Sequence, residues 1–215
     1  MNGPAFSMRA ALGFGWQATW AHLGFFIVLM IVVGVLEVVP GAVANALARS
    51  SPVLSALLRL VGMVLSLLMS IGLIHIALRF VDQQPARLGD LFARASVFFP
   101  YLAVSLLAGI IVSIGLVLLV IPGIYLGLRF QFAPYLVVDR GIGPLAALAQ
   151  SGDLTRGVKL RLLGFDLLLV LVWLVGALVL IVGLLVAMPT IILATAHVYR
   201  QLERRAVGTP AGVPT

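Results

Sequence analysis

The sequence predicts an all-α fold, a polytopic transmembrane helical bundle with about six spans. Of the 215 residues, 62% are hydrophobic and only 10% are charged, whereas a soluble domain carries about 25% charged residues. The mean hydropathy is +1.20. The apolar residues are gathered in runs long enough to cross a hydrocarbon layer, which takes about 20 residues per helix. Lipid is therefore the expected solvent for most of the surface.

The charge and the cysteine content narrow the possible partners. The net charge is +7 and there is no cysteine. In a soluble protein this charge would suggest nucleic acid, but here the basic residues lie in short loops beside apolar runs. The expected partners are membrane lipids, with anionic headgroups on the cytoplasmic side, and no nucleic acid. The lack of cysteine excludes disulfides, thiol nucleophiles and Cys-ligated metals.

The first element is expected at residues 2–22, a semi-polar segment. Met8, Leu12, Trp16 and Trp20 recur there every four residues, which places them on one helical face. Two tryptophans on such a face predict an interfacial amphipathic helix that lies on the membrane.

The spans follow in order, within a single transmembrane domain over residues 1–205. Pro40-Gly41 is predicted to end the first span, and Ile121-Pro122-Gly123 marks a turn and a restart, because Pro fits the first turn of a new helix. Gly183 permits a tight turn before the last span. The spans are expected at residues 23–39, 53–80, 98–120, 122–138, 162–182 and 184–202.

Two segments outside the spans complete the chain. Residues 144–156 have the pattern of a short amphipathic linker helix, in which Leu145, Leu148 and Leu154 are apolar among polar neighbours. Residues 206–215 contain Gly, Pro and Thr, and they predict a disordered tail.

The basic residues orient the bundle, because cytoplasmic loops carry an excess of Lys and Arg. With the amino terminus inside, the outer loops carry Arg49, with Arg59 close to that side. The inner segments then carry Arg9, Arg79, Arg87, Arg94, Arg140, Arg156, Lys159, Arg161, Arg200, Arg204 and Arg205. Both termini are therefore expected in the cytoplasm.

A weak internal repeat links the returning helices. Residues 72–80 (GLIHIALRF) and 122–130 (PGIYLGLRF) match at an offset of fifty, and residues 189–196 (PTIILATA) form a fainter third copy. The repeat predicts three helical hairpins of the same orientation, as in parallel-repeat membrane folds. The alternative is that apolar segments resemble one another through composition alone.

Small residues at four-residue spacing predict helix contact faces, since close packing matters more where lipid removes the hydrophobic drive between helices. The alternative is that Gly, Ala and Ser are simply common in membrane helices. The spacing occurs in the second, third and fourth spans, at Gly62, Ser66 and Ser70, at Ser105, Gly109 and Ser113, and at Gly123 and Gly127.

Few ionisable groups enter the spans, where each is costly. Arg129 lies near the middle of the fourth span and Asp166 lies about one turn into the fifth, at depths compatible with a pair. Glu37 and Arg59 are expected to face each other near the outer surface. A further polar cluster is expected near the inner ends of the helices, where His75 and His197 could lie together with Arg79, Asp166, Tyr199 and Arg200.

Two interpretations of these groups remain open. His and Asp can relay protons and Arg can bind an anion, so they could line a pathway. They could also form an internal ion pair with two interfacial histidines, because both histidines lie close to Arg-marked helix ends.

No motif indicates catalysis. The sequence has no H-E-x-x-H, no G-x-S-x-G and no P-loop. No carboxylate has metal-ligand spacing with any of the three histidines. We therefore predict no catalytic, metal or cofactor site.

Two stretches resemble a known family. They are residues 121–139 (IPGIYLGLRFQFAPYLVVD) and residues 147–165, which hold ALAQSGDLTRG and KLRLLGF. Together they resemble the YciC-like group of uncharacterised bacterial six-helix membrane proteins, which is similar to the membrane domain fused to some glycerophosphodiester phosphodiesterases. The matching residues are Pro122, Gly123, Tyr125, Arg129, Phe132, Ser151, Leu154, Thr155, Gly157, Tyr199 and Arg200.

The resemblance implies a multi-pass protein of the bacterial inner membrane and supplies no catalytic residue. The chain departs from the group at Asp139-Arg140, where an acidic pair is more usual. The sequence favours a non-enzymatic membrane scaffold or envelope-homeostasis component. The alternative is a small permease or exporter with Arg129 and Asp166 in a polar pathway. A membrane-protein partner or a homo-oligomer is compatible with both.

Overall fold

The computed structural model describes residues 6–208, apart from the side chains of residues 180–182 and 208. The described residues are helical, with no strand among them, which confirms the all-α class. The helices are α1 (Met8–Ala21), α2 (Leu23–Leu47), α3 (Pro52–Val81), α4 (Phe98–Leu118), α5 (Val120–Phe130), α6 (Ala133–Arg140), α7 (Pro144–Leu154), α8 (Lys159–Leu178) and α9 (Leu180–Gly208), with two 3-10 turns, η1 (Leu88–Leu91) and η2 (Ala95–Val97), before α4.

Six stretches of the described chain are long and apolar enough to cross a membrane. They confirm the polytopic fold and its number of spans. α5 and α6 together form the fourth stretch, over Val120–Arg140. α7, the predicted linker helix, lies between that stretch and α8.

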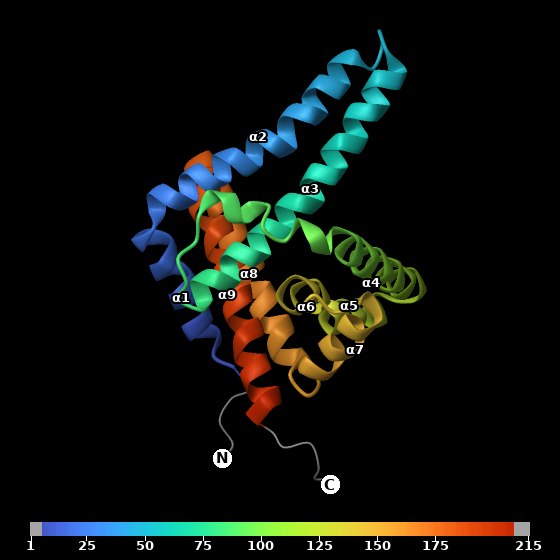
Figure 1. The fold of residues 1–215 in the computed structure, drawn as a ribbon. Coiled ribbons are helices and arrows are strands. Elements are labelled where there is room, and N and C mark those ends of the chain that lie inside the picture. Colours follow the sequence, from blue (N-terminus) through green and yellow to red (C-terminus); the bar gives the residue numbers. More distant parts are fainter. Residues whose placement is uncertain (1–5, 209–215) are drawn as a thin grey trace.

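Consecutive spans pair as three helical hairpins, α2 with α3, α4 with α5 and α8 with α9. Asp82, directly after α3, and Asp139, near the end of α6, both bond to Arg200 in α9. The three returning segments therefore end at one side of the molecule, so the hairpins share an orientation. Figure 1 shows the α2–α3 hairpin projecting away from the α8–α9 hairpin.

The second and third hairpins are closed by paired glycines. Gly123 lies against Leu116 of α4, and a Cβ there would lie 2.7 Å from the backbone nitrogen of Leu116. In the same way, a Cβ at Gly176 would lie 2.6 Å from the Cβ of Ala187. Gly183 is already inside α9, so its expected role in a turn is wrong. Like Gly123, it follows the turn and allows two backbones to approach closely.

The predicted end of the first span at Pro40 is wrong, and the fourth span has a break that was not predicted. α2 continues through Pro40 to Leu47, although proline removes a hydrogen bond and disfavours a helix interior. Its ring lies beside Gly62, where a Cβ would be 3.4 Å from the Pro40 Cβ, so α3 covers the irregular turn. The fourth span, by contrast, is interrupted between Phe130 and Ala133, and Pro134 lies in the first turn of α6.

A helix, α1, forms within the predicted segment; its two tryptophans stay exposed, and a different set of small residues packs against the protein. Ala11, Gly15 and Thr19 are fully buried, while Trp16 and Trp20 are 52% and 50% exposed. Small residues win this face because they let α1 approach α9 closely.

α1 runs antiparallel along α9. The Ser7 backbone N–H donates to Gln201 at 2.9 Å, and farther along α1 the Thr19 and Thr190 hydroxyls lie 3.2 Å apart. The beginning of the described chain thus lies beside the last turns of α9.

The remaining differences concern one packing face and the C-terminus. A Cβ at Gly109 would meet nothing within 4 Å, so the predicted Ser105–Gly109–Ser113 face makes no close contact there. α9 continues to Gly208, past the expected start of the tail at residue 206. The rest of that predicted tail, residues 209–215, lies outside the described residues.

Candidate functional site

The best-connected polar group in the described chain is the guanidinium of Arg200, in α9. Its Nε and Nη2 donate to the Asp82 carboxylate at 3.0 and 2.6 Å. Its Nη1 and Nη2 also donate to Asp139 at 2.6 and 2.8 Å, and Nη1 donates to Glu203 at 2.7 Å. One side chain therefore connects the ends of α3, α6 and α9.

Neighbouring side chains extend these contacts. The Tyr199 hydroxyl donates to Asp139 at 3.0 Å, and the Arg140 Nε donates to Glu203 at 3.0 Å. Arg140 also reaches Gln150 of α7 at 3.2 Å. We call this group the Arg200 cluster; it comprises Arg200, Asp82, Asp139, Glu203, Arg140 and Tyr199.

The cluster is largely shielded from solvent. The Arg200 side chain is 15% exposed, and those of Asp139 and Glu203 are 16% and 13% exposed. Burying charges is favourable only where the geometry is good and the donors are satisfied. Each terminal nitrogen of Arg200 has carboxylate partners, so none is left for a ligand.

A second ion pair fixes the loop that precedes α4. The Arg79 Nη1 donates to Asp90 at 3.1 Å, and Asp90 also accepts from the backbone N–H of Arg87 at 2.8 Å. The turn η1 lies directly on α3, because a Cβ at Gly72 would overlap the backbone of Leu91. This loop is thereby held against the same end of α3 as the Arg200 cluster.

The motif residues in α7 dock this helix onto the end of α5. The fully buried Ser151 donates to the backbone carbonyl of Arg129 at 2.7 Å. That carbonyl lies in the last turn of α5, where no intrahelical partner is available. Thr155 is also fully buried and bonds back to the Ser151 carbonyl at 3.0 Å. Gly152 lies against the Arg129 side chain, where a Cβ would come within 2.9 Å of the Arg129 Nε.

The other motif positions also make structural contacts. Pro122 lies in the first turn of α5. Lys159, at the start of α8, donates to the Tyr125 hydroxyl at 3.0 Å. Gly157 has a φ of +74°, which lies in the left-handed region that glycine adopts readily. The motif therefore describes how α5, α7 and α8 are joined.

The two intramembrane charges do not pair. Arg129 is exposed, and its guanidinium lies 5.5 Å from the Phe130 ring centre. Asp166 is half-buried in α8. Among the described residues, no ion pair joins either group to an opposite charge. The Arg129 side chain lies instead against Gly152, and α7 occupies that space.

The predicted polar cluster is assembled only in part. Arg200 and Arg79 hold the two ion-pair groups at the ends of α9 and α3. His197 stacks on Phe14 at 4.7 Å, and its Nδ1 is buried with no hydrogen-bond partner among the described residues. His75 is half-buried in α3, one turn before Arg79.

Glu37 and Arg59, which were predicted to face each other near the outer surface, do not bond to each other. Arg59 donates to the Asn45 side chain at 3.1 Å, while Glu37 accepts a long bond of 3.4 Å from Ser66. Each group finds a neutral partner across the α2–α3 hairpin, one turn or more from the other charge.

The sequence analysis did not predict the three carboxylates of the Arg200 cluster. Asp82, Asp139 and Glu203 lie beyond or at the ends of the apolar runs, where they look like solvated loop residues. A signal was present, because the chain has only seven acidic residues. Four of them, the three above and Asp90, lie in or after the final turns of returning spans that carry arginine there.

Several cavities lie among residues 6–208, and four of them bear on the candidate site. An almost wholly apolar one has a volume of about 530 Å³ between α1, α8 and α9. A cavity of about 260 Å³ is lined by His197, Arg200 and Arg204 with neighbouring Gln side chains. The other two lie beside Phe26 and beside His22. Neither Arg129 nor Asp166 lines any of the four. The described residues also contain no group of three or more His, Asp or Glu that could hold a metal ion.

Comparison with known proteins gives a limited but consistent result. No family model matches the chain, and no solved structure matches it. UPF0259 membrane protein SG1383 from Sodalis glossinidius (strain morsitans) is 29% identical over 105 residues. The match covers 48% of this chain and 42% of the length of that protein.

With six apolar helices, this similarity identifies a multi-pass integral membrane protein. It supports a relation to an uncharacterised bacterial membrane family, and it does not extend to the YciC-like group or to phosphodiesterases.

Proposed function

We propose that the protein is a non-enzymatic scaffold of the bacterial inner membrane, with both termini in the cytoplasm. In this proposal the Arg200 cluster is a structural clamp that fixes the three hairpins relative to one another. A role in envelope homeostasis and kinship with the YciC-like group are part of the same proposal. The motifs in residues 121–139 and 147–165 support that kinship.

The observation that carries the proposal is the saturation of Arg200. A residue that binds a passing anion needs free donors, but the Arg200 nitrogens are all engaged by Asp82, Asp139 and Glu203. The cluster also joins the ends of α3, α6 and α9, one from each hairpin. A permanent clamp at this position favours a rigid scaffold.

The alternative, a small permease, is favoured by Asp166. This carboxylate is half-buried in α8, and it has no hydrogen-bond or ion-pair partner among the described residues. A charged group in a span marks a substrate or proton pathway by default. The two functions differ in whether water from the outer side reaches Asp166.

Single cysteines can test this directly, because the native chain has none. Asp166→Cys and Arg129→Cys would be treated with a membrane-impermeant maleimide in right-side-out and in inside-out vesicles. The exposed loop positions Ser50→Cys and Arg156→Cys are the matched controls. We expect Ser50→Cys to react only from outside and Arg156→Cys only from inside. Asp166→Cys and Arg129→Cys should not react from outside.

The outcomes separate the two functions. Labelling of Asp166→Cys from the outer side, at a rate comparable with Ser50→Cys, would replace the scaffold by the permease. Reversed labelling of the two loop controls would overturn the proposed orientation.

A further inference from the structure

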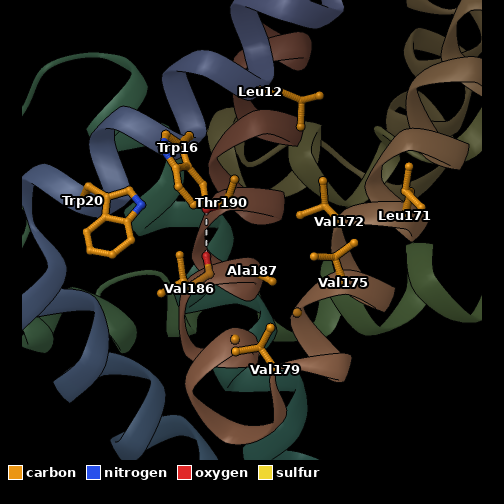
Figure 2. Close-up of a pocket in the computed structure, with 12 residues that line it drawn as sticks. Leu12, Trp16, Trp20, Leu171, Val172, Val175, Val179, Val186, Ala187 and Thr190 are labelled. Atoms are coloured by element: carbon orange, nitrogen blue, oxygen red, sulfur yellow. Dashed lines mark hydrogen bonds between the residues drawn. The ribbon is translucent and has the colours of Figure 1, made fainter.

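An almost wholly apolar cavity opens between α1 and the α8–α9 hairpin. Figure 2 shows Trp16 and Trp20 of α1 on one side and Leu171, Val172 and Val175 of α8 on the other, with Thr190 of α9 at the back. Its volume of about 530 Å³ is typical of small-molecule sites, which occupy about 300–1,000 Å³.

The cavity offers almost no polar contact. Among the described residues that line it, Thr190 is the only hydroxyl-bearing one, and this hydroxyl already donates to the Val186 carbonyl at 2.7 Å. The remaining lining side chains are aliphatic, apart from the two indoles. A hydrated solute would lose its water there without compensation, so the occupant must be a hydrocarbon.

Two arginines lie beyond one end of this cavity, toward the start of α1 and of α8. Arg9 precedes Leu12 and Trp16 by three and seven residues, so it lies on the same face of α1. Arg161 precedes Val172 and Val175 by eleven and fourteen residues, and it likewise shares their face of α8. Both are exposed, and neither has an ion-pair partner among the described residues.

The packing of α1 brings these two arginines to the same end. A Cβ at Gly164 would lie 3.5 Å from the Met8 methyl group, and the Phe6 and Phe165 rings meet edge to face at 6.1 Å. α1 and α8 therefore begin side by side. From Arg9 to Trp20 the helix rises about 16 Å, close to the half-thickness of a hydrocarbon core, about 15 Å.

We propose that this groove is a binding site for an anionic phospholipid. The acyl chain occupies the cavity between α1 and α8–α9, and the headgroup phosphate lies between Arg9 and Arg161. An apolar groove as deep as one leaflet suits an acyl chain, and the two unpaired cations at its end suit an anionic headgroup. The site is independent of the clamp, and it gives the two tryptophans of α1 a role in contacting lipid.

Quenching by brominated lipid tests the headgroup preference. The chain has three tryptophans, so Trp173→Phe leaves Trp16 and Trp20 as reporters. The protein would be placed in phosphatidylcholine vesicles with a small fraction of acyl-brominated phosphatidylglycerol or, in parallel, acyl-brominated phosphatidylcholine. We expect stronger quenching by the anionic lipid, and a loss of roughly fivefold in its apparent affinity on Arg9→Gln or Arg161→Gln.

The control for charge is Arg156→Gln, another exposed arginine outside this groove, which should leave the preference unchanged. Equal quenching by the two lipids would overturn the proposal. So would an equal loss of preference in Arg156→Gln, because the effect would then be general surface charge.

A second pair of variants tests the cavity itself. Val175 and Val170 are both 53% exposed on α8, but only Val175 lines the cavity. We expect Val175→Phe to reduce quenching by anionic lipid to the level of the neutral lipid, and Val170→Phe to have no effect. Undiminished quenching in Val175→Phe would show that no acyl chain occupies the cavity.

Discussion

Charged side chains are bonded very differently in two regions of the molecule. One region is the Arg200 cluster, and the other is the far half of the α2–α3 hairpin. At the cluster, carboxylates from α3, α6 and α9 share one guanidinium at 2.6–3.0 Å. In the hairpin, the exposed Glu37 has one long bond to Ser66. In the apolar stretch of α2, 17% of the residues are buried, whereas 44% are buried in that of α9. The ends of α3, α6 and α9 are thus joined by ionic contacts. The far half of the α2–α3 hairpin is held by the packing of its two helices against each other.

The strongest test of this contrast is Arg200→Leu. Removing the guanidinium leaves three shielded carboxylates facing one another, and breaking a buried pair in this way costs about 3–5 kcal/mol. We expect the free energy of unfolding to fall by that amount, measured by SDS titration of the protein in mixed micelles. Arg204→Leu is the matched control, since Arg204 is exposed one turn further along α9.

Arg200→Lys refines the same test. It keeps the charge but loses the bidentate geometry, so we expect an intermediate loss. If Arg200→Leu unfolded like Arg204→Leu, the cluster would not be a clamp.

A smaller effect is expected where α1 meets α9. A Cβ at Gly15 would lie 3.2 Å from the Ala194 nitrogen and closer still to the Thr190 carbonyl. Gly15→Val should therefore separate the two helices and lower the free energy of unfolding by about 1–3 kcal/mol. Gly13→Val makes the same chemical change in the same helix with nothing within 4 Å. Equal stability of the two variants would mean that α1 does not depend on this contact.

Features of the fold that depend on local sequence could be predicted, and features that depend on contacts between helices could not. Hydropathy and length act locally, so the six spans and their three hairpins were predictable. The kink before Pro134 and the continuous helix through Pro40 were not, because a neighbouring helix decides whether a broken turn is covered. Helical period placed the two tryptophans of α1 on one face, and both are exposed in the structure. It did not indicate that Gly15 and Thr19 would pack against α9.

The site was predicted less well for the same reason. Arg79 and Arg200 were found because charge near a span is rare, and the α7 motif was found through a resemblance. The partners Asp82 and Asp139 are far from Arg200 in sequence, 118 and 61 residues away. Only the arrangement of the hairpins brings them together. Arg129 and Asp166 matched in depth along their helices, but depth says nothing about which side of the bundle each one faces.

The smallest effect should come from Glu37→Gln, in the lipid-facing half of α2. Glu37 is exposed, and its bond to Ser66 is 3.4 Å long. A glutamine oxygen can accept the same bond, so we expect the free energy of unfolding to change by less than about 0.5 kcal/mol. The matched change at the cluster is Asp139→Asn, which removes a charge that faces Arg200 and should cost several times more. A Glu37→Gln effect as large as that of Asp139→Asn would mean that Glu37 has an ionic partner outside this chain. The α2–α3 hairpin would then be a contact surface for another protein, and no longer the lipid-facing part of the scaffold.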